Sequence, residues 1–225
     1  MQDAIFAASA RAVFDVITSG AAKPKALVDS LVQAVDEGRL MYQPATEDEA
    51  KLVGESKLSG KLPTSNTDST TLAAYVNDFT QSKLDYYVQL DLAASTQCTA
   101  PDSPVFTLTA KLTNTVTPQL APDLPRSIAP AKYFAKGHVA TNLVMYGPVG
   151  STKATVTVDG KAQSRSVFQH LGRPAILVPI YNSPGQSHTV TVEFQGAKGE
   201  YGPLEVRHTP MVRQTPITVE TPGCG

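Results

Sequence analysis

The sequence predicts a mainly β chain with an N-terminal helical segment, an α+β protein whose larger part is an immunoglobulin-like antiparallel β-sandwich. Three observations carry this prediction. Apolar residues recur with the period of a helix before residue 58, and they alternate with the period of a strand after residue 72. Threonine, whose branched polar side chain suits the solvent face of a strand, recurs in that second part. We therefore expect a helical segment at 1–71 and a sandwich with a C-terminal tail at 72–225.

The helical segment begins with two amphipathic helices. The first covers residues 2–19 and ends at Gly20, and the second begins near Pro24 and ends at Gly38. A short strand is expected at 40–42. The pattern Thr-Glu-Asp-Glu at 46–49 is a capping box that opens a brief third helix. These helices share too little apolar surface for a core of their own, so we expect a sheet or a neighbouring segment to cover them.

A polar linker at 59–71 precedes the strands, and a proline-rich crossover at 116–137 joins the two sheets of the expected sandwich. Asp159-Gly160 is a hairpin signal of type I′. The tail at 203–222 is expected to add an edge strand or to strap back across the domain. Strands are predicted at 72–76, 83–92, 105–113, 139–146, 153–158, 174–180 and 187–194.

Charge and hydropathy exclude several classes of protein. The formal net charge is −1, and the 19 Lys and Arg residues form no basic stripe, which argues against nucleic-acid binding. No apolar run is long enough for a membrane span, and residues 1–20 lack the pattern of a signal peptide. Because Met1 leads directly into an amphipathic helix, we expect a preceding part of the natural protein to be absent.

No residue pattern predicts catalysis, a cofactor or a metal ion. The Gly-x-Ser-x-Gly nucleophile motif, a phosphate-binding glycine loop and a calcium loop are all missing from the sequence. Asp85 and Asp91 share a face of one predicted strand with Asp78 just before it, a pattern more typical of a solvated surface than of a glycosidase pair. The histidines, each on a separate strand or loop, are His138, His170, His188 and His208.

Two cysteines, Cys98 and Cys224, are far apart in the sequence, without the spacing of a zinc or redox motif. They could be two buried thiols, two surface thiols or one long-range disulfide. We favour the disulfide, because a terminal thiol on the solvent side is a poor structural hydrophobe. Such a bridge would pin the tail and indicates an oxidising compartment.

One segment, residues 75–87, concentrates aromatic and polar side chains. As a contact surface for a glycan or a protein, it would stack Tyr75 and Tyr87 on the ligand and use Asn77, Lys83 and Asp85 for hydrogen bonds. The plainer interpretation, which we favour, is a β-hairpin with an Asn-Asp turn and a cross-strand Lys–Asp pair.

The same segment resembles the C-terminal half of a bacterial family, the domain of unknown function 4012. The resemblance covers essentially the whole chain. It implies a single-pass membrane-anchored protein of actinobacteria and related bacteria, with this part outside the cytoplasm and the anchor and an N-terminal extracytoplasmic region left off. It implies no activity and no catalytic residues. The matching segments are 2–6, 36–39, 77–78, 82–87 with Cys98, 142–150, 158–160, and 209–212 with Cys224.

We therefore expect a non-catalytic structural or binding module of an extracytoplasmic cell-envelope protein. Its expected partner is a cell-wall glycan or an envelope protein, with no nucleic acid, no cofactor and no membrane contact by this part of the chain. The alternative is an accessory part of an enzyme that acts on cell-wall glycopolymers, whose active site would lie mostly in the missing N-terminal region.

Overall fold

A computed structural model describes residues 2–98 and 104–221 of the chain. Its contacts divide the chain into two compact units, Met1–Lys61 and Leu62–Gly225. The division expected from the sequence lay at residues 71 and 72. The polar segment 62–69 belongs with the second unit because it bonds to it: the Asn66 side chain exchanges two hydrogen bonds with the backbone of Val149, at 2.9 and 3.1 Å.

The first unit contains three α-helices and a short 3-10 helix. The predicted capping box is confirmed, because Thr46 and Glu49 exchange bonds between side chain and backbone N–H at 3.3 and 3.2 Å. The strand predicted at 40–42 is wrong: this backbone joins no ladder, and the Tyr42 N–H donates to the Leu58 carbonyl at 2.8 Å. The helices are α1 (Gln2–Thr18), α2 (Pro24–Asp36), α3 (Glu47–Val53) and η1 (Lys57–Ser59).

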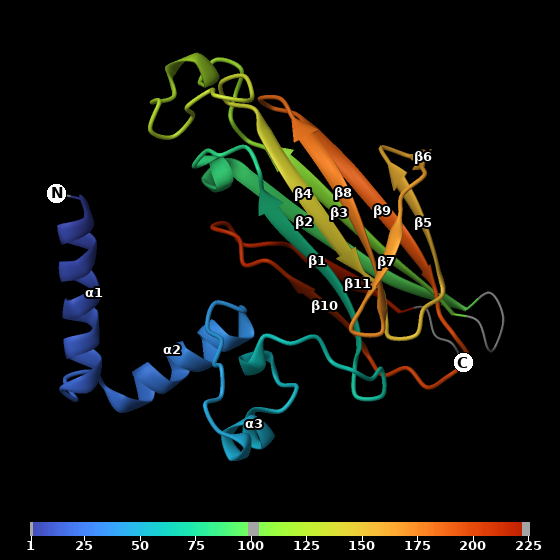
Figure 1. Cartoon of the computed structure of the whole chain (residues 1–225), viewed down its shortest axis with the longest axis horizontal. Coiled ribbons are helices and arrows are strands. Elements are labelled where there is room, and N and C mark those ends of the chain that lie inside the picture. The colour runs from blue at the N-terminus through green and yellow to red at the C-terminus, as the bar shows by residue number, and fades with distance from the viewer. Residues whose placement is uncertain (1, 99–103, 222–225) are drawn as a thin grey trace. The chain divides into compact units, whose positions relative to one another are not determined.

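The second unit consists of two mixed β-sheets, so the protein is mainly β and of the α+β class (Figure 1). The five-stranded sheet, here called sheet A, has the order β10 (Leu204–His208), β1 (Thr70–Asp78), β4 (Val139–Tyr146), β8 (Arg173–Asn182) and β7 (Val167–His170). The six-stranded sheet, sheet B, has the order β11 (Ile217–Glu220), β2 (Val88–Cys98), β3 (Pro104–Asn114), β9 (Ser187–Gln195), β5 (Lys153–Val158) and β6 (Lys161–Gln163).

The inner faces of the two sheets share one hydrophobic core. The alternation in the sequence builds this core, because every second residue of a strand points to the same face. In β3 the predicted alternation is confirmed: Phe106, Leu108 and Leu112 are buried, whereas Lys111 is exposed. The strands predicted at 139–146 and 153–158 coincide with β4 and β5.

The turn at Asp159-Gly160 is confirmed as a hairpin turn. Val158 pairs with Lys161 across it, and both turn residues have positive φ angles, +50° and +74°. A type I′ turn needs this left-handed backbone at both central positions. The turn therefore joins β5 to the short edge strand β6.

The hairpin predicted for residues 75–87 is wrong. β1 lies in sheet A and β2 lies in sheet B, so the residues between them form a crossover from one sheet to the other. Residues Leu84–Tyr87 form a short 3-10 helix, η2, instead of the start of a strand. The alternation of apolar residues there fits a strand, but it does not reveal which sheet receives the chain.

The sequence predicted wholly antiparallel sheets, and this prediction is wrong. The tail contributes one edge strand to each sheet: β10 pairs with β1, β11 pairs with β2, and both pairs are parallel. These strands join edges formed by segments more than 100 residues earlier in the chain, such as Leu72 opposite Val206. The edge strand expected in the tail is therefore present twice.

Candidate functional site

The outer face of sheet A, which points away from the core, displays a group of aromatic and apolar side chains. Strand parity places them there, because Leu72 and Ala74 of β1 and Met145 of β4 face the core, and their neighbours in the sequence face outward. We call this group the tyrosine face. Its members are Tyr75 of β1, Val144 and Tyr146 of β4, Leu177 of β8, and Phe168 and His170 of β7.

Three rings of the tyrosine face, from β1, β4 and β7, contact one another in a row. Tyr75 and Tyr146 pack edge to face, with ring centroids 5.9 Å apart and an interplanar angle of 75°. Tyr146 also packs on the ring of His170 at 5.7 Å, and its hydroxyl oxygen lies 3.2 Å from His170 Nδ1. These contacts hold Tyr146 in place between its neighbours, so that the row offers ring edges and polar atoms side by side.

Small residues flank Tyr146 in the sheet. Its partners across the ladders are Ala73 on β1 and Ala175 on β8, and both are fully buried although they lie on the outer face. Phe168, which is 42% exposed, pairs with Ala175 on the other side. Large and small residues therefore alternate along this row, which consists of Arg207, Ala73, Tyr146, Ala175 and Phe168.

Charged groups surround one end of the tyrosine face. Burial raises the pKa of the Tyr75 hydroxyl, although the nearby cations Arg207 and Arg173 oppose the rise. Tyr75 therefore stays protonated at neutral pH and can donate a hydrogen bond. Arg207 of β10 is the ladder partner of Ala73 on β1. It forms an ion pair with Glu205, with 3.5 Å between Nε and Oε1.

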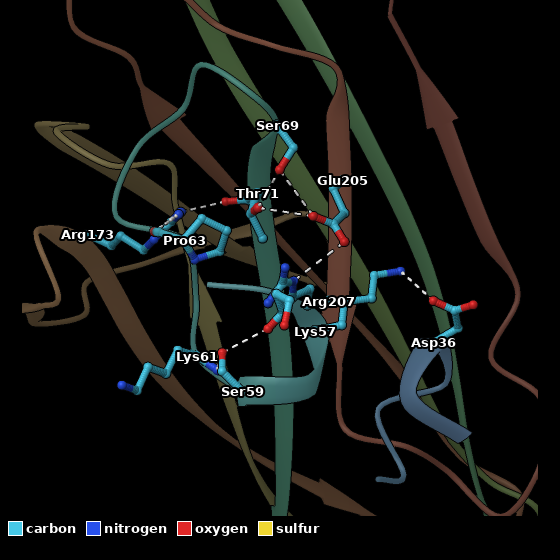
Figure 2. Close-up of polar contacts among 11 residues, drawn as sticks. Asp36, Lys57, Ser59, Lys61, Pro63, Ser69, Thr71, Arg173, Glu205 and Arg207 are labelled. Carbon is cyan, nitrogen blue, oxygen red and sulfur yellow. Dashed lines mark hydrogen bonds and ion pairs between the residues drawn. The ribbon is translucent and has the colours of Figure 1, made fainter. Parts of the chain in front are cut away.

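Arg173, the first residue of β8, lies at the same end of sheet A, opposite His170 of β7 in the ladder (Figure 2). It is completely buried, and its guanidinium group donates to three main-chain carbonyls. Nη1 donates to Thr71 at 2.7 Å and to Gly147 at 3.1 Å, and Nη2 donates to Pro63 at 2.6 Å. These bonds satisfy a buried cation and fix β1, the end of β4 and the 62–69 segment to one another.

Glu205 is the second polar anchor at this end (Figure 2). Its Oε2 atom accepts hydrogen bonds from the hydroxyls of Ser69 at 3.2 Å and Thr71 at 3.4 Å. The carboxylate thus ties the edge strand β10 to β1 through side chains as well as through the ladder. Together Arg173 and Glu205 make a rigid support for the tyrosine face.

The structure separates the residues of the predicted contact surface. Tyr75 and Asn77 lie on the outer face of sheet A, whereas Lys83, Asp85 and Tyr87 lie in the crossover to sheet B. Tyr87 packs edge to face on Tyr86 at 5.2 Å and partly against the core, and Tyr75 packs on Tyr146. The two tyrosines therefore do not form one stacking platform.

The carboxylates Asp78, Asp85 and Asp91 do not lie on one strand face. Asp85 belongs to η2, and its pKa is raised by burial and then by the negative charge of Asp78. The Asp78 carboxylate accepts hydrogen bonds from the backbone N–H of Thr80, at 2.9 Å, and from the Thr80 hydroxyl. Asp91 lies on β2 and accepts from Gln89 at 3.0 Å.

The four histidines also lie apart. His170 belongs to the tyrosine face, His188 Nδ1 lies 2.6 Å from Asp159 Oδ2, and His208 Nδ1 lies 2.8 Å from the Thr209 carbonyl oxygen. His138 lines a hollow beside the crossover at 129–138, whose volume of about 10 Å³ suits a single water molecule. In the part of the chain that the structure describes, no three His, Cys, Asp or Glu side chains are grouped to hold a metal ion.

Two further findings concern the cysteines and the membrane. Cys98 is the last residue of β2, and Cys224 lies outside the described residues, so the disulfide stays a prediction. None of the helices at 2–98 and 104–221 has both the length and the apolar character needed to cross a membrane.

Sequence reasoning missed Tyr146, His170 and Phe168 as members of a site. The one available indication was the alternation of the strand at 139–146, which places Tyr146 on the face that points away from the core. The strand β7 was not predicted, because its four residues lie between Ser166 and Leu171 without a clear alternation. The strand order, which no local pattern encodes, brings these rings together.

Comparison with known proteins gives little further information. No family model and no curated protein matches the chain. One solved structure with local similarity is described as a "putative nutrient binding protein" from Legionella pneumophila; it is 9% identical, with a TM-score of 0.33. The match covers 59% of this chain and 45% of that one, so this chain spans less than half of that protein's length.

Proposed function

We propose that the chain is a non-catalytic binding module of an extracytoplasmic cell-envelope protein, with an immunoglobulin-like sandwich that presents the tyrosine face to a cell-wall glycan. The single observation that carries the proposal is the row of Tyr75, Tyr146 and His170 on the outer face of sheet A. The envelope location rests on the sequence resemblance.

The chemistry of the tyrosine face suits a sugar chain. A pyranose ring has apolar C–H faces and a rim of hydroxyl groups, so it needs aromatic surface next to hydrogen-bonding groups. Phe168 and Leu177, which are 42% and 41% exposed, supply apolar surface. Tyr146, His170 and the outward-facing Asn77 supply polar atoms on the same face.

The shape of the face also favours an extended ligand over a small molecule. Small-molecule sites are concave and bury most of their ligand, whereas the tyrosine face follows a sheet surface across β1, β4, β8 and β7. A polysaccharide strand can lie along such a surface and contact several rings in turn. We therefore expect weak binding per sugar that increases with the length of the glycan.

The test is binding of the full chain to purified cell-wall polysaccharide and to soluble oligosaccharides of increasing length. We expect Tyr146→Ala and Phe168→Ala each to weaken binding up to about tenfold, since an aromatic contact contributes about 0.5–1.5 kcal/mol. Tyr133→Ala is the matched control, because Tyr133 is an exposed tyrosine outside the tyrosine face. Equal loss in all three variants, or no binding by the wild-type chain, would contradict the proposal.

A further inference from the structure

The directions of the strands bring five connections to one end of the two-sheet unit. β1, β3, β5, β8 and β10 finish there, and β2, β4, β6, β9 and β11 begin there. Figure 1 shows the largest of these connections as a yellow-green lobe beyond the ends of the strands. The fifth and shortest connection is the turn at 159–160, and we call the four longer ones the loop end: residues 79–87, 115–138, 183–186 and 209–216.

The loop end is positively charged in an otherwise acidic chain. It holds five cations and two carboxylates, a formal surplus of three positive charges, whereas the whole chain carries −1. Two carboxylates border the loop end, and both are engaged by the protein: Asp78 accepts from Thr80, and Asp159 of the 159–160 turn accepts from His188 and Thr189. The charged residues of the loop end are Lys83, Arg126, Lys132, Lys136 and Arg213, with Asp85 and Asp123.

Exposed rings stand beside these cations. Tyr133 is 60% exposed, and the Lys132 ammonium lies 4.8 Å from its ring centroid. Tyr86 is 56% exposed, and the Arg213 guanidinium lies 5.4 Å from its ring centroid, so the pair joins the crossover at 79–87 to the tail. Val212, next to Arg213, is 62% exposed as well. Apolar and cationic groups therefore reach solvent together.

The connections are held in position by contacts among themselves. Phe79, Phe134 and Tyr181 form a cluster of three rings, with centroids between 5.7 and 6.2 Å apart. The Lys83 N–H donates to the Ile128 carbonyl at 2.8 Å. The loop end is therefore an ordered protruding surface, and its hollow of about 10 Å³ is far too small for a ligand.

We propose that the loop end docks on an anionic lipid surface. Cations near such a surface are attracted by its negative potential, and tyrosine rings partition to the boundary between headgroups and acyl chains. A soluble polyanion would use the cations but would gain nothing from Tyr86, Tyr133 and Val212. The lipid surface is the partner that satisfies both kinds of side chain on a convex face.

This inference departs from the expectation that this part of the chain makes no membrane contact. It is independent of the glycan-binding proposal, because the loop end and the tyrosine face consist of different residues. The lipid contact is peripheral, through side chains of the loop end, and requires no membrane-spanning segment.

The test is co-sedimentation of the full chain with two kinds of vesicle, phosphatidylcholine alone and phosphatidylcholine mixed with phosphatidylglycerol. We expect binding to the mixed vesicles only, and we expect it to weaken as salt is added. The double variant Lys132→Glu/Arg213→Glu should bind the mixed vesicles at least tenfold more weakly. Its matched control is Arg11→Glu/Lys23→Glu, which makes the same change in net charge at exposed positions of the first unit.

Tyr133→Ala separates lipid docking from simple charge attraction. We expect it to weaken vesicle binding severalfold without changing the dependence on salt, because it removes a ring and no charge. Two results would overturn the proposal: no binding of the wild-type chain to the mixed vesicles, including the case in which it binds soluble inorganic polyphosphate instead, or equal loss in the Arg11→Glu/Lys23→Glu control.

Discussion

The guanidinium of Arg173 donates a hydrogen bond to the main-chain carbonyl of Thr71 at 2.7 Å, and it thereby joins β8 to β1 across the end of the strand between them (Figure 2). The same nitrogen also donates to Gly147, which directly follows that intervening strand, β4. One side chain thus fixes the spacing of three strands. The tyrosine face lies on these strands, so its geometry depends on this buried arginine.

We predict that Arg173→Met lowers the free energy of unfolding by about 3 kcal/mol, because it leaves buried carbonyls without donors. Arg173→Lys should cost less, since the ammonium keeps the charge but cannot span all three carbonyls. Urea unfolding measures both. Arg165→Met, at an exposed position, is the control and should change little. An unchanged midpoint in Arg173→Met would show that the three bonds do not stabilise the fold.

Gly202 and Gly199 make a matched pair in the connection before β10. A Cβ atom on Gly202 would lie 2.4 Å from the Thr67 carbonyl oxygen, whereas a Cβ on Gly199 would meet nothing within 4 Å. We expect Gly202→Ala to destabilise the chain by about 1–3 kcal/mol, because backbone would have to move. Gly199→Ala should be neutral or slightly stabilising. Thermal unfolding distinguishes them, and equal melting temperatures would contradict the close approach at Gly202.

Asp159 gives a pH dependence with a defined sign. The Thr189 N–H and then the His188 side chain lower the pKa of its carboxyl group. A carboxyl whose pKa is lower in the folded chain stabilises the fold above the pKa of the unfolded chain, and this contribution is lost as the pH falls through the folded pKa. Because the site is exposed, we expect less than about 1 kcal/mol.

The variant Asp159→Asn tests this assignment. Asparagine tolerates the left-handed backbone at position 159, where φ is +50°, so the turn itself is preserved. The wild-type chain should be more stable than the variant at about pH 7, and the difference should shrink toward about pH 3. Urea unfolding at a series of pH values is the measurement. A difference that does not change with pH would rule out the carboxylate as its source.

The disulfide between Cys98 and Cys224 can be tested with the intact chain. β11 runs parallel to β2 with Glu220 opposite Ser95, so the tail runs alongside β2 in the direction of Cys98. Without reductant, we expect the tryptic peptide that carries Cys98 to be linked to the one that carries Cys224. Reduction should lower the free energy of unfolding by about 4–5 kcal/mol in the chain-entropy model. Free thiols at both positions in protein prepared without reductant would exclude the bridge.

The sequence predicted those elements that local chemistry determines. The capping box at Thr46 and Glu49 and the turn at Asp159-Gly160 depend on a few adjacent residues, and both are present. The strands at 139–146 and 153–158 have clear alternation and clear turn signals at their ends. Each of these features needs no information about the rest of the fold.

The sequence could not predict which strands become neighbours. Residues 75–87 have the alternation of a hairpin, but β1 and β2 belong to different sheets. For the same reason the sequence placed Tyr75 on one contact surface with Tyr87. Its actual neighbour, Tyr146, is brought next to it only by the β1–β4 ladder. Contacts between segments 70 residues apart depend on the whole core, and the candidate site consists of such contacts.

The last two strands also set the order of events during synthesis. β10 and β11 occupy the open edges of β1 and β2, which leave the ribosome more than 100 residues earlier. Until residues 204–220 have been synthesised, a nascent chain would expose two unpaired backbone edges, which are templates for association with another chain. A chain that ends before Leu204 would keep both edges open permanently, and premature termination would therefore yield an aggregating product in place of a shortened but functional one.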